Sequence, residues 1–538
     1  MILFLAFLVL ISVDSRFRTR SRFLKAKVEL LRGEVEACKG NFSQRKNGAE
    51  YANVDVHLMA DFDIVGDGSL FQMLNRCSTR LGERLFIENL CKANLSTKNI
   101  LEKQDAVVEL SEKEGFVQDF QVYGSYFSES QSDIEYLQRW VSFKEESARG
   151  VRFFTYFCPA IVVLWVVLYL LGIAPITTLS IPVVLNLSAL GLYFSKIQKS
   201  YARLGKSAKI VKKYIPLLRL IEEQEFNSVH LNNAKSQLFT NGKMASDSLK
   251  SLFNILNLFD QNNNIFVVVV LNSLFGFSLQ TYSALCRWKG HNAHSLQCWL
   301  SAISEVDSLV SYGVYRFNNL GDTIMPEVLS VGFSIDAQQV GHPLIPQSRR
   351  VSNSIVIKNA PSVNIITGAN MAGKSTFLRT VAVNLMLAMN GAPVVAREFR
   401  FTPCNIISSI KIQDALSKNE SYFYAEISRL KYIVDYLNNS PKTLVILDEI
   451  LRGTNTRDKQ IGSLGFLEKL IARGAVVFVA THDLEVGKLE DKHPQIARNY
   501  CFEVELNGEE LVFDYKLKDG VSQKLNASFL LRKMGLID

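Results

Sequence analysis

A glycine-rich segment at residues 363–376 has the residue types of a phosphate-binding loop. Residues 363–367 are a largely β-branched run, and an apolar helical pattern begins at Lys374. Gly368 and Gly373 bracket four residues and are followed by Lys374 and Ser375, the spacing G-x-x-x-x-G-K-[ST]. Glycines let backbone N–H groups converge on phosphate oxygens, and the following helix directs its positive end toward them. The alternative is an ordinary glycine-rich turn. The pattern predicts that ATP contacts Gly368, Ala369, Asn370, Met371, Ala372, Gly373, Lys374, Ser375 and Thr376.

A second apolar run, residues 443–447, ends in two adjacent carboxylates, Asp448 and Glu449. A buried strand that ends in Asp is typical of a Walker B element, so we expect Asp448 and Ser375 to hold Mg²⁺. Glu449 is then placed to act as the general base that polarises the attacking water. The alternative is a pair of exposed carboxylates in a turn.

A third apolar run, residues 475–480, precedes His482. Open α/β sheets bind ligands at the C-terminal ends of their strands, so this histidine can lie beside the phosphate loop and sense the γ-phosphate. Lys374 is expected to reach the outer phosphates, and with Glu449 and His482 it forms the predicted catalytic set. A purely structural histidine is the alternative.

Two serines compete for a role in trans. In ATPases with a composite site, a partner subunit presents a serine at a helix start to the γ-phosphate. Ser417 lies in a sequence loosely like the transporter signature L-S-G-G-Q but lacks both of its glycines. Ser421 precedes a clear helical pattern and is the preferred candidate, which implies a homodimer. An ordinary surface serine is the alternative.

The composition indicates a multidomain chain with an uneven distribution of apolar residues. A chain of 538 residues is too long to fold around a single hydrophobic core, so two to four domains are expected. The net charge of +8 suits nucleic acid or an anionic membrane surface without distinguishing them. The eight cysteines form no C-x-x-C pair and no zinc spacing, which is typical of reduced thiols in a cytosolic protein.

Two long uncharged segments predict a membrane hairpin. Residues 153–171 and 173–194 contain no charged residue, and Gly172 and Pro175 supply a turn between them. Positive residues flank both outer ends, so both ends are expected in the cytosol. The alternative is a hairpin buried in a protein core. The flanking residues are Arg149, Arg152, Lys196, Lys199, Arg203, Lys206, Lys209, Lys212 and Lys213.

Two further apolar segments are less clear. Residues 1–13 are apolar and precede a basic stretch, which favours a membrane anchor over a buried or interfacial helix. Residues 262–286 are also uncharged. A single crossing there would place the phosphate loop on the wrong side of the membrane, so we expect a buried helix or a re-entrant segment.

The motifs together resemble those of the MutS family. The family's T-G-x-N-M-x-G-K-S-T matches residues 367–376, and its D-E-x-x-R-G-T-x-T resembles residues 448–456, with Leu451 at a position where mismatch-repair members usually have glycine. Its A-T-H matches residues 480–482, and its S-x-F-x-x-E matches residues 421–426, which favours Ser421 over Ser417.

Further matches lie near the N-terminus and at the C-terminus. The family's core domain carries G-S-L, L-N, G-x-R-L and Q-D-A-V segments, which resemble residues 68–70, 74–75, 82–85 and 104–107, with Lys103 in place of an arginine. Residues 520–535 resemble the family's closing helical segment. No domain with the F-x-E mismatch wedge precedes residue 50. The chain therefore looks like a membrane-associated branch of the family that lacks the mismatch-recognition domain.

The resemblance implies a multidomain fold: a mostly α-helical core and lever region with a transmembrane hairpin, followed by an α/β P-loop ATPase domain of the ABC type. It implies DNA as a partner and a mismatch-repair-like role. We expect a membrane-anchored, homodimeric ATPase whose ATPase domain faces the cytosol at a cytoplasmic (inner) membrane, in contact with lipid. The alternative is a membrane-associated mechanochemical ATPase without DNA binding. The expected divisions are a possible anchor at 1–22, a helical core at 23–150, the hairpin at 151–195, a helical return at 196–330 and the ATPase domain at 331–538.

Overall fold

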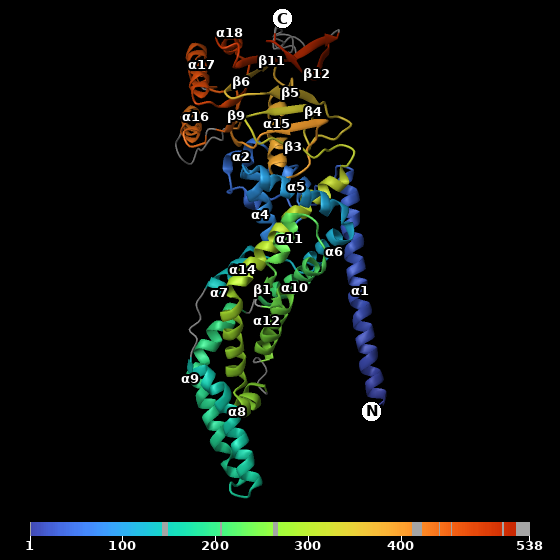
Figure 1. Cartoon of the computed structure of the whole chain (residues 1–538), viewed down its shortest axis with the longest axis vertical. Coiled ribbons are helices and arrows are strands. Elements are labelled where there is room, and N and C mark those ends of the chain that lie inside the picture. Colours follow the sequence, from blue (N-terminus) through green and yellow to red (C-terminus); the bar gives the residue numbers. More distant parts are fainter. Residues whose placement is uncertain are drawn as a thin grey trace.

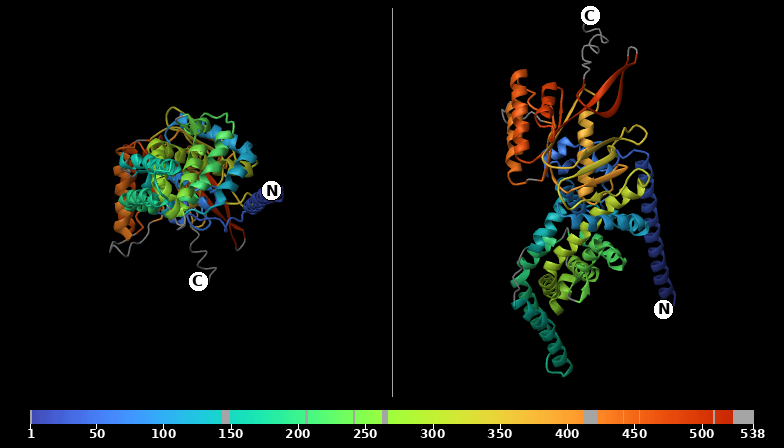
Figure 2. Two further views of the ribbon diagram at one scale, coloured as in Figure 1. Left: turned by 90° about the horizontal axis from the view of Figure 1, so that it is seen from below. Right: turned by 45° about the horizontal axis from the view of Figure 1, so that its top comes forward.

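The computed structural model shows a long, mostly helical molecule (Figure 1). It describes residues 2–142, 149–204, 207–240, 242–261, 267–411, 422–440, 442–452, 454–507 and 510–522. A part with mixed α/β structure lies at one end, and a pair of apolar helices projects at the other. The second view of Figure 2 shows the same separation, with helix α1 standing apart along one side.

The helical part is built from shorter helices, most of which pack along one long helix, α14 (Phe277–Asn318). Side-chain caps start several of them: Ser69 accepts a hydrogen bond from the Gln72 N–H, and Thr79 accepts one from the Gly82 N–H. These helices are α2 (Val56–Asp61), α3 (Leu70–Leu74), α4 (Arg80–Cys91), α5 (Thr97–Glu112), α6 (Glu114–Ser125), α7 (Gln131–Ser142), α10 (Ser207–Glu223), α11 (Val229–Ser236) and α12 (Ala245–Asp260). A short β1–β2 ladder (Phe239–Thr240 with Lys243–Met244) precedes α12.

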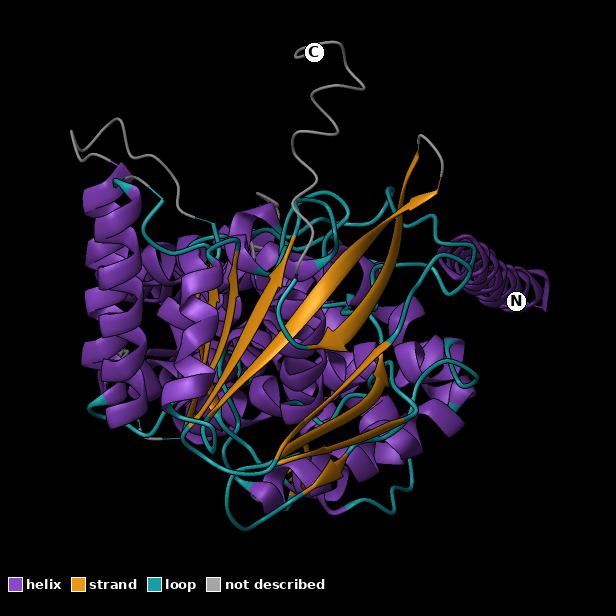
Figure 3. Ribbon diagram, turned by 90° about the horizontal axis from the view of Figure 1, so that it is seen from above, coloured by secondary structure: helices purple, strands orange, loops and turns teal. Residues whose placement is uncertain are grey.

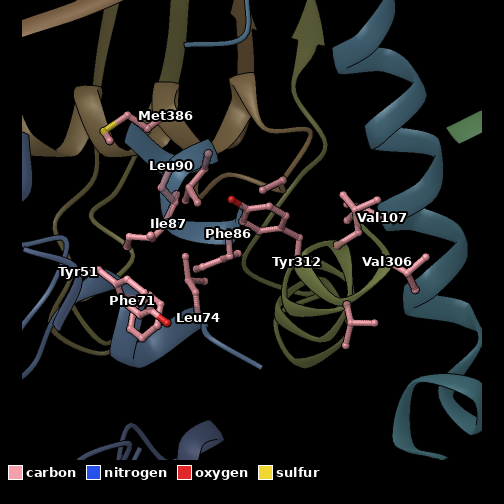
Figure 4. Packing of buried hydrophobic residues seen from close by; sticks show 14 of the residues in the cluster. Tyr51, Phe71, Leu74, Phe86, Ile87, Leu90, Val107, Val306, Tyr312 and Met386 are labelled. Carbon is pink, nitrogen blue, oxygen red and sulfur yellow. The ribbon is translucent and has the colours of Figure 1, made fainter. Parts of the chain in front are cut away.

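One continuous hydrophobic core joins the helical part to the α/β part. Phe86 of α4 packs on Tyr312 of α14, with ring centroids 5.0 Å apart. Met386, from helix α15 (Lys374–Met389) of the α/β part, belongs to the same cluster (Figure 4). A polar contact adds to this join, because the Gln104 side chain donates to the Pro326 carbonyl at 2.8 Å. The two parts therefore share a packed interface rather than a loose tether.

The apolar pair consists of α8 (Arg149–Leu170) and α9 (Ser180–Leu204). Residues 150–170 and 176–201 are long and apolar enough to cross a membrane, and only 11% and 22% of their most apolar windows are buried within the protein. The prediction of two long apolar helices is confirmed. The alternative of a hairpin buried in this chain's own core is wrong, because most of its surface is exposed.

An elbow made of residues 267–285 packs against this hairpin. It comprises a π-helical turn (Val267–Leu271), α13 (Asn272–Phe275) and the first residues of α14, with a bend of 75° at the break. Gly276 has φ 61°, and a Cβ there would lie 2.9 Å from Cys158 Cβ, so both its backbone and its surroundings favour glycine. The Asn186 side chain donates to the Ser273 carbonyl at 2.8 Å.

Helix α1 (Ile2–Cys38) carries the apolar N-terminal residues. Its first turns expose Leu3, Phe4, Phe7 and Leu10. The alternative of burial in this chain's core is therefore wrong for these residues. Its C-terminal end is attached to the helical part, where Glu34 pairs with Arg76 at 2.7 Å.

The α/β part contains a mainly parallel sheet (Figure 3). Its strands run in the order β12 (Glu510–Asp519), β11 (Ala497–Asn507), β6 (Ser362–Gly368), β10 (Val476–Thr481), β9 (Thr443–Asp448) and β8 (Asn405–Ser409). All neighbours are parallel except β11 and β12. Helices α15, α16 (Tyr422–Leu437), α17 (Thr456–Ala472) and α18 (Leu489–Lys492) accompany it. A second sheet orders β3 (Glu327–Val328), β7 (Glu398–Phe401), β4 (Ile335–Val340) and β5 (Asn353–Ile357).

Candidate nucleotide-binding site

The three strands singled out in the sequence lie side by side and end at one edge. β10 is flanked by β6 and β9, all parallel. Thr367 is in register with Thr481, and Ala480 is in register with Asp448. The loop after β6 and the polar residues after β9 and β10 therefore meet at the C-terminal edge of the sheet, as the sequence predicted.

The loop between β6 and α15 is shaped for close backbone approach. Gly368 has φ 146°, and a Cβ there would lie 2.6 Å from the Phe502 carbonyl oxygen, so a side chain has no room. The Lys374 ammonium is held inside the loop, where it donates to the carbonyls of Gly368 and Ala369 at 2.8 and 2.9 Å. Burial lowers the pKa of Lys374, while Glu449 and Asp448 nearby act in the opposite direction.

Asp448 and Ser375 lie together, as expected for two ligands of one cation. The Ser375 side chain lies near the Asp448 carboxylate, which is buried at the end of β9. Burial raises the pKa of Asp448, and the nearby Ser375 hydroxyl and Arg452 guanidinium partly offset the rise. A divalent cation would remove the remaining cost of this buried charge.

Glu449 lies within a cluster of cationic and polar groups. His482 Nε2 is 2.6 Å from Glu449 Oε1, and the same nitrogen is 2.6 Å from Asn370 Oδ1. Arg452 Nε lies 3.1 Å from the second carboxylate oxygen. The hydrogen bond from His482 lowers the pKa of Glu449 to about 2, so the group is ionised near neutral pH. Lys374 Nζ is 3.3 Å from His482 Nε2, which brings the three predicted catalytic residues together.

A buried carboxylate fixes the loop after Glu449. Glu426 of α16 accepts hydrogen bonds from the backbone N–H groups of Leu451 and Arg452. Sequence reasoning noted Glu426 only as part of a motif and did not assign the contact of Arg452 with Glu449. The D-E-x-x-R spacing was the available signal for Arg452, because it places the two side chains three residues apart.

Three non-glycine residues of the site adopt left-handed backbone conformations. Met371 has φ 65°, Glu449 has φ 51° and Leu451 has φ 59°. Such conformations cost about 1 to 3 kcal/mol each and persist where surrounding contacts enforce them. Leu451 occupies the position where glycine was expected from the family. Its side chain is nevertheless buried, and Gly462 leaves space beside its Cδ1 atom.

The residues present fit ATP and Mg²⁺. The Lys374 ammonium and the loop backbone suit phosphate oxygens, and Ser375 with Asp448 supplies hard oxygen donors. In the part of the chain that the structure describes, no group of three or more His, Cys, Asp and Glu is placed to hold a metal by itself. Ser417, Ser421, Gly453 and residues 523–538 lie outside the described residues.

Comparison with known proteins gives the family. The model of MutS domain III matches residues 57–312, and that of MutS domain V matches residues 364–531. DNA mismatch repair protein MutS of Thermotoga maritima is 33% identical over 209 residues, which are 38% of this chain and 26% of that protein. MutS protein homolog 4 of Homo sapiens is 28% identical over 259 residues, which are 46% of this chain and 27% of that protein.

The similarity thus spans about a quarter of the length of these curated relatives. The two domain models follow one another along the chain in the order III then V, and together they cover most of it. The first lies over the helical part, and the second begins within β6, directly before the phosphate loop. This chain belongs to the MutS family.

Proposed function

We propose that the protein is a membrane-anchored ATPase of the MutS family that binds and hydrolyses ATP in a site completed by a second copy of the chain. One observation carries the proposal: Lys374, Asp448 with Ser375, Glu449 and His482 converge at one edge of a parallel sheet. These are the groups needed to hold the phosphates, bind a cation, activate water and contact the γ-phosphate.

The roles follow from the geometry. Lys374 would exchange its two carbonyl contacts for phosphate oxygens. Ser375 and Asp448 would hold Mg²⁺, which would supply positive charge beside the phosphates. Glu449 accepts a proton from the attacking water. His482, hydrogen-bonded to Glu449 and Asn370, orients this carboxylate and lies close enough to the loop to contact the terminal phosphate. Ser421 of a second copy is proposed to complete the site.

Membrane anchoring is supported by the exposed apolar hairpin and the exposed apolar turns of α1. The most apolar 18-residue windows within residues 150–170 and 176–201 have mean hydropathies of 2.2 and 1.6, and little of their surface is covered. The elbow packs on the hairpin through the Asn186–Ser273 hydrogen bond. We propose that it enters the same apolar layer as a re-entrant segment. The α/β part lies at the opposite end of the molecule, on the proposed cytosolic side (Figure 1).

DNA processing is a second candidate for the work that hydrolysis supports. The match to MutS domain III and the names of the relatives favour it, and so does the net charge of +8. The exposed apolar hairpin favours the other candidate, mechanical work at a membrane. ATP turnover with homoduplex, mismatched duplex and no DNA, at two salt concentrations, separates the two candidates. Stimulation that weakens at higher salt supports the first, and equal rates support the second.

Three experiments test the main proposal. Lys374→Ala should abolish ATP binding by the purified full chain, whereas unchanged binding would contradict the site. Mixtures of Ser421→Ala and Lys374→Ala subunits should recover part of the turnover that each lacks alone. If every mixture stays inactive, the assignment of Ser421 in trans is wrong. Alkaline extraction of membranes from expressing cells should leave the chain in the lipid fraction, and its release into the supernatant would contradict anchoring.

A further inference from the structure

The helical part contacts the α/β part through a buried acidic residue at the end of α2. Asp61 is 2% exposed and accepts three hydrogen bonds from residues at and after the end of β8: Ser408 Oγ at 2.7 Å, the Ile410 N–H at 3.2 Å and the Lys411 N–H at 2.7 Å. Asp63, two residues later, pairs with Arg379 of α15 at 3.0 Å. β8 lies next to β9, the strand that ends at Asp448.

From β8 the contacts continue into α16. The Ser408 carbonyl accepts a hydrogen bond from Arg429 Nε at 2.9 Å. Arg429 is buried, and the Asp61 carboxylate stabilises its positive charge. A buried guanidinium needs such partners because its desolvation is costly. Ser408 therefore connects the helical part to α16, because its hydroxyl donates to Asp61 and its carbonyl accepts from Arg429.

One turn before Arg429, the same helix carries Glu426, which binds the backbone of Leu451 and Arg452. The Arg452 side chain in turn contacts Glu449 Oε2 at 3.1 Å. Asp61, Ser408, Arg429, Glu426, Arg452 and Glu449 thus form an unbroken series of neighbouring groups, here called the Asp61–Glu449 series. The phosphate loop and Lys374 lie outside this series.

We propose that Asp61 is a positioning residue for the water-activating carboxylate: through α16 it fixes where Glu449 lies, so that the helical part controls the rate of ATP hydrolysis rather than ATP affinity. This inference rests on the proposed ATPase function. Small misplacements of a catalytic group cost large factors in rate, whereas phosphate binding by the loop does not use the series. The helical part also carries the elbow and the hairpin, so the same contacts give the membrane end a route to the site.

The test is steady-state ATP turnover by the full chain, with ATP affinity measured separately. Asp61→Asn keeps the size of the side chain but removes the negative charge that stabilises Arg429. We expect kcat to fall about tenfold with ATP affinity unchanged. Ser408→Ala removes the hydroxyl that donates to Asp61 but keeps the backbone carbonyl that accepts from Arg429. It should likewise lower kcat and leave ATP affinity unchanged. Glu112→Gln, a change at an exposed acid of α5, is the matched control and should resemble the wild type.

A double-mutant cycle distinguishes positioning of Glu449 from a general structural role of Asp61. It compares the effect of Asp61→Asn on ATP turnover in the presence and in the absence of the Glu449 carboxylate. In a Glu449→Gln background, adding Asp61→Asn should leave the residual turnover unchanged, because the two substitutions then act on one step. If Asp61→Asn lowered turnover by the same factor in the Glu449→Gln background as in the wild type, the inference would be overturned. So would wild-type kcat in both Asp61→Asn and Ser408→Ala, or a loss of ATP affinity that matches the loss of kcat. A wild-type chain without any turnover would instead overturn the proposed function on which the inference rests.

Discussion

His482 Nε2 lies 2.6 Å from Glu449 Oε1, and this pair joins the ends of two strands at the candidate site. The histidine follows β10 and the glutamate follows β9, so the contact depends on the parallel pairing of those strands. The same nitrogen also reaches Asn370 in the phosphate loop. One imidazole therefore links all three segments from which the site is built.

His482→Ala should reduce ATP turnover by about 10² while ATP still binds, because Lys374 and the loop backbone remain. Without the histidine, Glu449 loses the hydrogen bond that most lowers its pKa and the contact that orients it. Comparison of kcat with ATP affinity checks this. Loss of affinity without loss of kcat would show that His482 serves binding and not hydrolysis.

Glu449 should also contribute to stability against acid. Its folded pKa, about 2, lies below the ordinary value of 4.5. Its stabilising contribution is therefore fully present above about pH 4.5 and is lost as the pH falls through the folded value. The difference in unfolding free energy between the wild type and Glu449→Gln should shrink between pH 5 and pH 3. A constant difference across that range would contradict the pKa assignment.

Asp307 predicts a pH effect of the opposite sign in the helical part. It lies outside the hairpin and the elbow and accepts hydrogen bonds from the N–H groups of Ser78 and Thr79. Burial nevertheless raises its pKa to about 7. Between about pH 4 and 7 the folded state binds more protons at this site than the unfolded state, so the stability that depends on Asp307 should fall as pH rises. Asp307→Asn should remove this slope in urea titrations. Parallel pH profiles of the two proteins would contradict the prediction.

Leu451 gives a prediction in which packing competes with backbone strain. Leu451→Gly relieves about 1 to 3 kcal/mol of left-handed strain but removes a buried side chain worth about 2 to 5 kcal/mol. We therefore expect a net loss of stability, measured by thermal unfolding. Leu451→Ala is the control, because it loses most of the packing and keeps the strain, so it should be the less stable variant. A stabilised glycine variant would show that the leucine is merely tolerated here.

The elbow can be tested at its glycine. Gly276→Ala places a Cβ against Cys158 and forces a side chain into a left-handed conformation, which should cost about 1 to 3 kcal/mol. Gly191→Ala in α9 is the matched control: no atom lies within 4 Å of its added Cβ. Thermal unfolding in mild detergent should separate the two variants. Equal stabilities would mean that the elbow does not pack on the hairpin as described.

Sequence reasoning predicted the site where the chemistry depends on short motifs. The meeting of Gly368 to Thr376, Asp448, Glu449 and His482 at one edge of the sheet could be predicted because each ends or follows a recognisable strand. Their roles in ATP hydrolysis stay predictions. Sequence reasoning did not predict the hydrogen bonds of Glu426 with the backbone of Leu451 and Arg452, or those of Asp61 with the end of β8. These contacts join residues that are far apart in the chain. The bend at Gly276 was equally hidden, since apolar composition alone does not distinguish a straight span from a broken one. The choice between Ser417 and Ser421 stays a prediction.

The most direct test of the ATPase account is the fate of ATP on the purified full chain, compared between the wild type and Glu449→Gln in the presence of Mg²⁺. The account predicts steady conversion of ATP to ADP by the wild type. It predicts that Glu449→Gln binds ATP but hydrolyses it only at a small residual rate, with subunits held as a stable dimer. Hydrolysis by Glu449→Gln at the wild-type rate would contradict the role of Glu449 and with it the proposed mechanism.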